Sequence, residues 1–380
     1  MNRRTRPQPT PSPPAGRSAE PLRIALIGGP RFGIGEPLAG GMEALILGLA
    51  TELTRAGCSV TVFAGTGDSE AVSPSGVRCI PFASELFTPS PDARADVSMP
   101  PERFMAEHHA FLALGTRLRH AQFDVVHNHS LHYLPPLFEA PSPMVHTLHS
   151  PPTPWLESAH ACRTRTTDIV VSVSRSNAAR WGGIADRVIP NGVDVVRWGR
   201  PEGAPKSERV VWSGRLVPEK APHLAMAAAR LAGRPIDLAG PIHDQQYFDT
   251  MVRPELDDRA RYLGHLEVDA LADLVGGSAV AVVTPVWDEP YGLVVAEALA
   301  AGTPVAAFAR GAIPDVVDET CGVLAAPDDV HGLAAAIGRA ATLDPSACTE
   351  RARRHCSVRV MAERYTATYR DALAAVGSVR

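Results

Sequence analysis

The chain has 380 residues, of which 45% are apolar and 21% are charged, and its formal net charge is −4. A single hydrophobic core rarely grows beyond ~250–300 residues, so two domains are expected. The small negative charge excludes the broad basic field typical of nucleic-acid-binding proteins, and no apolar run approaches the ~20 residues of a membrane-spanning helix.

Residues 1–20 are rich in proline and begin with three arginines, but no apolar stretch follows them. That composition predicts a disordered arm and argues against an export signal. The six cysteines are scattered without a CxxC pair, which favours reduced thiols and a cytoplasmic location.

From residue 22 onward, short apolar runs alternate with segments of helical periodicity. The run at 22–29 predicts a buried strand, 42–57 predicts a helix that Gly57 ends, and 59–65 predicts a second strand. Further strands are expected at 123–129, 143–150 and 166–174, the last followed by a helix-like stretch. The polar, proline-bearing stretch 89–110 receives no assignment.

The second half repeats this plan after the Asn191-Gly192 turn, where we place the domain junction. Strands are expected at 207–216, 235–241, 260–266, 278–287, 303–311 and 321–327. Helices are expected at 221–233, 292–302 and 358–376. Strands alternating with helices predict an α/β fold of two doubly wound, Rossmann-like domains with mostly parallel sheets.

Ligands of such sheets bind beyond the carboxyl ends of the strands. The first strand leads into a loop with six glycines, at 28, 29, 33, 35, 40 and 41. Their backbone N–H groups, just before a helix, could approach a phosphate. The spacing is not that of a GxGxxG dinucleotide fingerprint, which argues against an oxidoreductase. A flexible surface loop is the alternative.

Two cations follow the first strand of the second half. Arg215 and Lys220 share one short loop, where a guanidinium and an ammonium would suit a diphosphate. The alternative is a pair of solvated basic side chains.

Two carboxylates, Glu289 and Glu297, lie eight residues apart across a loop-to-helix boundary that Gly292 is expected to open. The helix start tolerates negative charge, and a carboxylate can accept hydrogen bonds from two vicinal ribose hydroxyls. The alternative is an ordinary acidic helix start, but the apolar neighbours predict a buried helix, where an unpaired carboxylate is costly.

Histidines crowd two strand ends in the first half, at positions 127, 129, 132, 146 and 149. A zinc site is conceivable, but no cysteine or carboxylate joins them at ligand spacing, so we expect no metal site. We expect His149, and then His129, in the cleft, with His127 and His146 facing away from these neighbours.

These features resemble, in their joint order, the retaining glycosyltransferases of family 4, which have the GT-B fold. The motifs that carry the resemblance span about 22–373: GGME at 40–43, DVVHNH, TLHS, IPNGVD, SGRLVPEK, and E-x7-E within DEPYGLVVAEALAAGTPV. TGDS at 66–69 and WDEPYG are most similar to members that use UDP-glucose-type donors.

The resemblance implies two domains facing a central cleft: 21–190 for the acceptor and 191–357 for the nucleotide sugar, with the helix 358–376 packing back onto the first. Arg215 and Lys220 would hold the diphosphate, Glu297 the ribose, and Glu289 the transferred sugar. Backbone groups at Gly41, Tyr291, Gly292 and Leu293 would complete the donor site. His149 would lie near the reacting carbon, with Glu43 and His129 on the acceptor side.

The chain departs from the family pattern at two loops. Ala221 replaces the usual glycine after Lys220, and one segment replaces Gly-Gly-x-Pro-Glu. That segment reads Arg310, Gly311, Ala312, Ile313, Pro314 and Asp315.

The sequence therefore predicts transfer of a hexose from a nucleotide sugar, with UDP favoured over GDP or ADP, to a small-molecule, lipid or glycan acceptor. The resemblance implies retention of the anomeric configuration. No Asp-x-Asp pair occurs, so no metal ion is expected, and no cofactor is expected besides the donor substrate. Nucleic acid is not an expected partner; peripheral membrane contact is compatible with the sequence. The alternatives are a nucleotide-sugar epimerase or hydrolase of the same fold and a non-catalytic nucleotide-sugar-binding protein.

Overall fold

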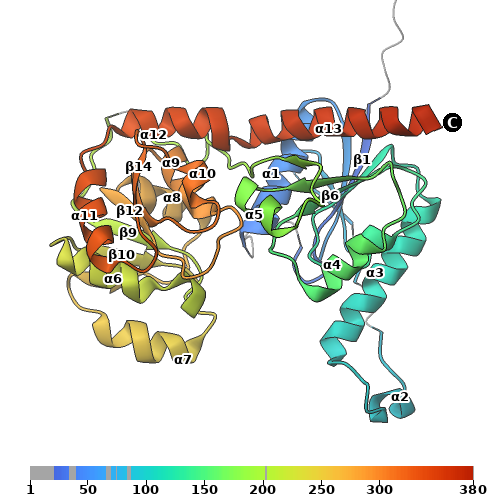
Figure 1. Ribbon diagram of the computed structural model, residues 1–380, viewed down its shortest axis with the longest axis horizontal. Coiled ribbons are helices and arrows are strands. Elements are labelled where there is room, and N and C mark those ends of the chain that lie inside the picture. The colour runs from blue at the N-terminus through green and yellow to red at the C-terminus, as the bar shows by residue number, and fades with distance from the viewer. Residues whose placement is uncertain are drawn as a thin grey trace, which may run out of the picture.

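The computed structural model describes residues 21–33, 40–65, 70–73, 75–83, 87–201 and 203–379. Two sheets lie next to each other, each with its own helices, and the helix α13 (Val358–Val379) runs along one side of the molecule (Figure 1). The expected disordered arm, Gly35 and the TGDS segment 66–69 lie outside the described residues.

The first sheet has the strand order β3-β4-β2-β1-β5-β6-β7-β8, parallel except for the β3–β4 pair. Its strands are β1 (Arg23–Ile27), β2 (Ser59–Phe63), β3 (Ala71–Val72), β4 (Arg78–Ile80), β5 (Val125–Asn128), β6 (Met144–Leu148), β7 (Ile169–Ser172) and β8 (Arg187–Val188). Its helices are α1 (Gly41–Arg55), α2 (Pro91–Ala95), α3 (Glu102–His120), η1 (Pro135–Leu137), α4 (Pro154–Ala161) and α5 (Arg175–Arg180).

The second sheet is parallel throughout, in the order β11-β10-β9-β12-β13-β14. Its strands are β9 (Val210–Ser213), β10 (Ile236–Ala239), β11 (Ala260–Tyr262), β12 (Val280–Val283), β13 (Val305–Phe308) and β14 (Gly322–Ala325). The helices that follow are η2 (Pro218–Lys220), α6 (Pro222–Leu231), α7 (Gln245–Tyr247), η3 (Phe248–Val252), η4 (Arg253–Glu255), α8 (Val268–Gly276), α9 (Leu293–Ala300), α10 (Ile313–Val316), α11 (Val330–Ala340), α12 (Pro345–Arg351) and η5 (Ala352–Cys356).

The alternation of residues along each central strand explains why both faces of the sheets are covered. In β1, Ile24 and Leu26 pack toward α1 and α13, while Ala25 and Ile27 pack toward α3. The second sheet divides in the same way, with Val210 in one core and Val211 in the other. The predicted doubly wound α/β architecture is therefore confirmed.

The unassigned stretch 89–110 contains α2 and the first half of α3. The residues of α3 that bury their side chains are Ala110, Phe111, Leu114 and Leu118, so the core contact begins where that stretch ends. The first half of α3 projects away from the sheet, with α2 at its tip (Figure 1).

Two backbone segments connect the halves of the molecule, and they pair with each other. Val193 N–H donates to Cys356 O at 2.7 Å, and Val358 N–H donates to Val193 O at 2.9 Å. Gly192 permits this approach, because a Cβ there would lie 2.4 Å from Val358 Cα. Beyond this crossing, α13 packs on α1, β5 and β6 of the first sheet and buries Tyr365 and Tyr369 completely.

Within the described residues, none of the helices combines the length and the apolar composition that crossing a bilayer requires.

Candidate functional site

Both sheets have a switch point, where the strand order reverses, and the predicted site residues follow the strands at these two points. In the first sheet, the glycine-rich loop follows β1 and His129 follows its neighbour β5. In the second sheet, Lys220 follows β9 and Glu289 follows its neighbour β12. Switch points at the carboxyl edge of parallel sheets are where ligands bind in such folds.

The structure brings Lys220 and Glu289 into direct contact, as an ion pair between Lys220 Nζ and Glu289 Oε2. Trp287 completes this group: its Nε1–H donates to the same carboxylate oxygen at 3.1 Å, and Lys220 Nζ lies 5.3 Å from its ring centroid. A cation beside an indole ring is attracted to the ring face. The ammonium is therefore held at the end of β12 by a carboxylate and an aromatic ring.

The backbone beneath Lys220 is held by Thr284, which follows β12. The Thr284 hydroxyl accepts from Trp212 Nε1 at 3.1 Å and lies 3.0 Å from the carbonyl oxygens of Lys220 and Ala221. Thr284, Trp212 and Ala221 are buried and Lys220 is half-buried, so these hydrogen bonds are protected from water. The loop that carries the cation is thus fixed to the neighbouring strand.

Ala221 adopts a left-handed conformation, with φ +45° and ψ +53°, immediately before α6 begins. This region of φ/ψ space is unfavourable for residues with a Cβ and favourable for glycine. The alanine in place of the usual glycine therefore introduces backbone strain next to Lys220.

The second departure, at 310–315, packs directly on the Glu289 loop. A Cβ at Gly311 would lie 2.3 Å from Glu289 O, and Gly311 has φ +57°, so the remaining glycine is at the position that needs one. Ala312 N–H donates to Glu289 O at 2.8 Å. Arg310 forms an ion pair with Asp328. These contacts hold the backbone of Glu289.

The first turns of two helices from different halves meet beside this group. Gly292 has φ +85° and forms the N-cap of α9, which confirms that it opens the helix. A Cβ added to Gly41, the first residue of α1, would lie 2.7 Å from Leu293 Cδ1 in the first turn of α9. Helix starts present unpaired N–H groups and a partial positive charge, so an anion between them would be stabilised by both.

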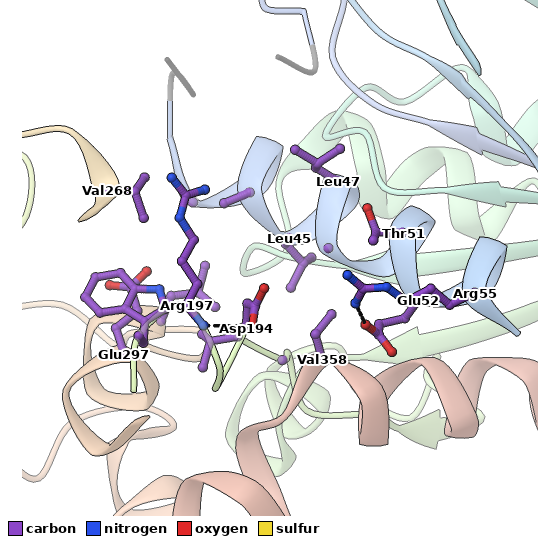
Figure 2. A pocket seen from close by; sticks show the side chains of 17 residues that line it. Leu45, Leu47, Thr51, Glu52, Arg55, Asp194, Arg197, Val268, Glu297 and Val358 are labelled. Atoms are coloured by element: carbon purple, nitrogen blue, oxygen red, sulfur yellow. Dashed lines mark hydrogen bonds and ion pairs between the residues drawn. The ribbon is translucent and has the colours of Figure 1, made fainter. Parts of the chain in front are cut away.

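Glu297 lines a cavity of about 190 Å³ between the two halves, together with Gly41 and Leu293. Figure 2 shows Glu297 and Arg197 toward one end of this cavity and Arg55 of α1 toward the other. Burial raises the pKa of the Glu297 carboxyl to about 7. Within the described part of the chain, no hydrogen bond or ion pair engages this carboxylate, which leaves it available to a ligand.

This cavity is not lined by Arg215, Lys220 or Glu289. The two parts of the candidate site are joined through Gly292, where a Cβ would lie 3.5 Å from Glu289 Cγ and which directly precedes Leu293. Glu289, Gly292 and Leu293, with Lys220 bound to Glu289, therefore gather around the start of α9.

Arg215 is the most exposed of the four predicted charged residues. Its side chain is 51% exposed, and its guanidinium lies 3.9 Å from the carboxylate of Glu219 on the same loop. Tyr291, by contrast, is 4% exposed and packs its ring into the core of the second sheet, so it can offer the site only backbone groups. Burial also raises the pKa of its hydroxyl well above the ordinary range.

On the first sheet, His129 and His149 form a hydrogen-bonded pair, with His129 Nδ1 2.9 Å from His149 Nε2. Burial lowers the pKa of His149 to about 4. Burial, together with the neighbouring His127 and His149, lowers the pKa of His129 well below its usual range. Both rings are therefore neutral at physiological pH, and one of them donates to the other.

The prediction that His127 faces away from His129 is wrong. Their ring centroids are 3.9 Å apart, because residues two positions apart along a strand share a face. His127 is fully engaged elsewhere: Nδ1 lies 2.7 Å from the Tyr369 hydroxyl and Nε2 lies 2.8 Å from Thr147 Oγ1. It joins β5 to α13 and is a structural residue.

Glu43 lies half-buried in the first turn of α1, two residues after Gly41, and favours the helix start electrostatically. Within the described residues, the structure contains no group of three or more histidine, cysteine, aspartate or glutamate side chains placed to hold a metal ion.

The sequence reasoning missed the contribution of α5, which bridges the two halves. Its N-cap residue Ser174 donates from Oγ to Pro290 O at 2.7 Å, and Arg180 pairs with Asp288. Asn177 donates to Leu148 O at 2.8 Å, directly before His149. Nothing in the local pattern of α5 signals these contacts, whereas Trp287 could have been found from its place two residues before Glu289.

Comparison with known proteins identifies the family. Residues 39–197 match the family model Glycosyltransferase Family 4, and residues 207–342 match Glycosyl transferases group 1. The chain is 33% identical to a glycogen synthase of Mycobacterium tuberculosis, over 83% of this chain and 85% of that protein. It is 27% identical to a D-inositol 3-phosphate glycosyltransferase of Mycolicibacterium smegmatis, over 89% and 87%.

Solved structures share the fold. A sucrose-phosphate synthase from Thermosynechococcus elongatus superposes with a TM-score of 0.73 at 23% identity, covering 93% of this chain and all of that chain. The Anabaena protein Alr3699/HepE, solved in complex with UDP-glucose, gives a TM-score of 0.66 at 19% identity, covering 91% and 99%. The chain therefore belongs to the family 4, or group 1, glycosyltransferases and has the GT-B fold.

Proposed function

We propose that this protein transfers a hexose from a UDP-sugar to a hydroxyl group of an acceptor, with retention of the anomeric configuration and without a metal ion. The observation that carries the proposal is the meeting of two helix starts, α1 and α9, beside the Lys220–Glu289 pair and the unpaired Glu297 carboxylate. The two helix starts and Lys220 attract anions, and the carboxylates of Glu289 and Glu297 accept hydrogen bonds from hydroxyl groups.

The diphosphate, the ribose and the transferred sugar of the donor each have a matching group. The diphosphate lies between the helix starts, where Lys220 and the exposed Arg215 neutralise its charge. Glu297 accepts the two ribose hydroxyls as an ionised carboxylate. Glu289 accepts hydroxyls of the sugar when Lys220 turns toward the phosphates. The cations and helix starts supply the positive charge that a metal ion would otherwise provide.

In the reaction, the bond between the anomeric carbon and the β-phosphate oxygen breaks, and a bond from the acceptor oxygen forms on the same face. The acceptor proton passes to the departing diphosphate. In this proposal the neutral His149–His129 pair, which follows β5 and β6 of the first sheet, donates a hydrogen bond to the sugar. Losing one such preorganised donor typically reduces the rate by ~10²–10³.

The relatives indicate which substrates to test first. Their names specify glucan synthesis and transfer to inositol 3-phosphate, and a protein of the same fold binds UDP-glucose. We therefore place UDP-glucose first among donors, and α-1,4-linked glucose oligomers and inositol 3-phosphate first among acceptors.

The test follows release of UDP from UDP-glucose with each acceptor, and the product linkage by NMR. We expect an α-linked product, turnover that survives EDTA, and a loss of ~10²-fold or more in Lys220→Ala and Glu297→Ala. A β-linked product would rule out retention, and inactivation by EDTA would rule out metal independence.

The alternatives give different results in the same assay. A hydrolase or epimerase converts UDP-glucose at full rate without any acceptor. A non-catalytic binding protein binds UDP-glucose and turns over none of it with any acceptor in the panel. Unchanged turnover in both variants would mean that the site lies elsewhere.

A further inference from the structure

Three aromatic side chains gather on the surface of the first domain, where α4, α3 and the segment after β5 come together. Trp155 lies 5.3 Å from Tyr133 and 6.1 Å from Phe104, measured between ring centroids. The rings of Phe104 and Tyr133 are nearly parallel, at 11° and 6.5 Å. We call Phe104, Tyr133 and Trp155 the aromatic platform. Trp155 is 61% exposed, an unusual state for so large an apolar side chain.

Further rings support the Tyr133 side of the platform from below. Tyr133 stacks on His132 at 4.6 Å, and His132 stacks on Phe111 at 4.2 Å. Phe111 is fully buried, and the Tyr133 hydroxyl lies 2.7 Å from His108 Nδ1. A surface whose rings are already fixed loses little entropy when it binds a ligand.

The platform residues Tyr133 and Trp155 follow the histidine pair closely in the sequence. Tyr133 follows His129 by four residues, and Trp155 follows His149 by six. Six residues span at most about 20 Å even when fully extended. A short oligosaccharide covers that distance, so one ligand can reach from the platform to the histidine pair.

Polar groups beside the platform suit a sugar rather than a lipid. Glu107, on the same helix as Phe104, binds Arg31 through both carboxylate oxygens, at 2.5 and 3.0 Å, and also contacts Arg103 at 3.3 Å. A pyranose has an apolar C–H face that packs on a flat ring, and hydroxyl groups around its edge that bind such paired charges. A lipid surface would call instead for a cluster of unpaired basic residues.

We propose that the acceptor is a glycan and that the aromatic platform binds its sugar residues beyond the one that receives the transferred hexose. This inference rests on the proposed transferase function and names the acceptor class. It predicts that the affinity for the acceptor rises with the length of the oligosaccharide until the chain reaches Trp155, because each added sugar gains contact with the platform.

The experiment measures binding to an array of neutral oligosaccharides of one to eight units, followed by kinetics with UDP-glucose and the glycan bound best. We expect Trp155→Ala to lose the preference for longer chains and to raise the acceptor KM at least about tenfold. Trp155→Phe should restore part of the affinity, because it keeps a flat ring. Leu231→Ala, which removes another exposed apolar side chain from α6 in the second domain, should match the wild type.

The affinity for UDP-glucose, measured for each variant by calorimetry, separates this inference from the proposed function. If UDP-glucose binds but no oligosaccharide does, or if Trp155→Ala binds glycans as the wild type does, the platform is not an acceptor site. If UDP-glucose itself does not bind, the proposed function fails, and glycan binding that depends on Trp155 would still support the platform.

Discussion

Glu297 is the residue at which the proposed donor binding and the stability of the fold favour opposite protonation states. Binding of the ribose favours the ionised carboxylate, and folding favours the protonated carboxyl. Its half-buried side chain lines the cavity and has no ion pair among the described residues, and burial raises the pKa of its carboxyl from 4.5 to about 7. The folded protein therefore holds a proton that the unfolded chain releases between these two pH values. Stability contributed by this group is present below pH 4.5 and is lost as the pH rises through 7.

Glu297→Gln should consequently stabilise the ligand-free protein at pH 8, by roughly 1–3 kcal/mol, because an amide avoids the burial of a charge. At pH 4.5 the two proteins should have equal stability. Denaturant unfolding at both pH values measures the difference, and equal stability at pH 8 would contradict the account. In the wild type, affinity for UDP-glucose should increase from pH 5.5 to 8, since only the ionised carboxylate accepts both ribose hydroxyls.

Ala221 allows a second test at a single residue. Its left-handed backbone costs a residue with a Cβ ~1–2 kcal/mol, whereas glycine loses up to ~1 kcal/mol more chain entropy on folding. Ala221→Gly should therefore raise the free energy of unfolding by about 0.5–1 kcal/mol. Ala225→Gly, in the interior of α6, is the matched control and should lower it by about 1 kcal/mol. Loss of stability in Ala221→Gly would show that the backbone is unstrained.

Individual candidate site residues could be predicted from the sequence where a polar side chain directly follows a predicted strand. Lys220 and Glu289 could be expected to meet because both come after strands, and β9 and β12 prove to be neighbours. The Ala221 conformation could be anticipated only from the glycine that it replaces. The pairing of His129 with His149 could not be predicted, because it depends on the lateral spacing of β5 and β6.

At the level of elements, the helices and strands with strong periodicity were predictable, and a helix of mixed composition was not. α1 ends at Arg55, next to the expected stop at Gly57, and α9 begins after Gly292 as expected. The helix α3 was not predicted. Its first half projects from the body and has a mixed composition, and its buried residues lie in the second half.

The short helix α5 and its N-cap residue Ser174 connect the two domains through one buried hydrogen bond and two exposed ion pairs, Arg175–Asp315 and Arg180–Asp288. The buried hydrogen bond should contribute more to stability than the Arg180 ion pair. Ser174→Ala leaves Pro290 O without its buried donor and should lower the stability by ~1–3 kcal/mol. Arg180→Ala removes an ion pair whose side chains are both more than 40% exposed, and should change it by less than about 0.5 kcal/mol. Thermal unfolding of the two variants checks this order, and the reverse order would contradict it.

At the scale of the whole molecule, the proposed donor site draws its groups from both domains, so neither domain holds a complete site. The second domain supplies Lys220, Glu289 and Glu297, while the first supplies the start of α1 and the histidine pair. The division into two Rossmann-like domains could be predicted from the alternation of strands and helices. The way in which Gly41 meets Leu293 could not, because no local pattern encodes the contact between domains.

Titration calorimetry with UDP-glucose tests this shared donor site most directly. We expect the wild type to bind, and Lys220→Ala and Glu297→Gln each to weaken binding at least about tenfold, as expected for the loss of a charge-assisted hydrogen bond. Arg230→Ala, an exposed cation on α6 that pairs with Glu255, should bind as the wild type does. If all four proteins bind UDP-glucose with the same affinity, the groups around the start of α9 do not form the donor site.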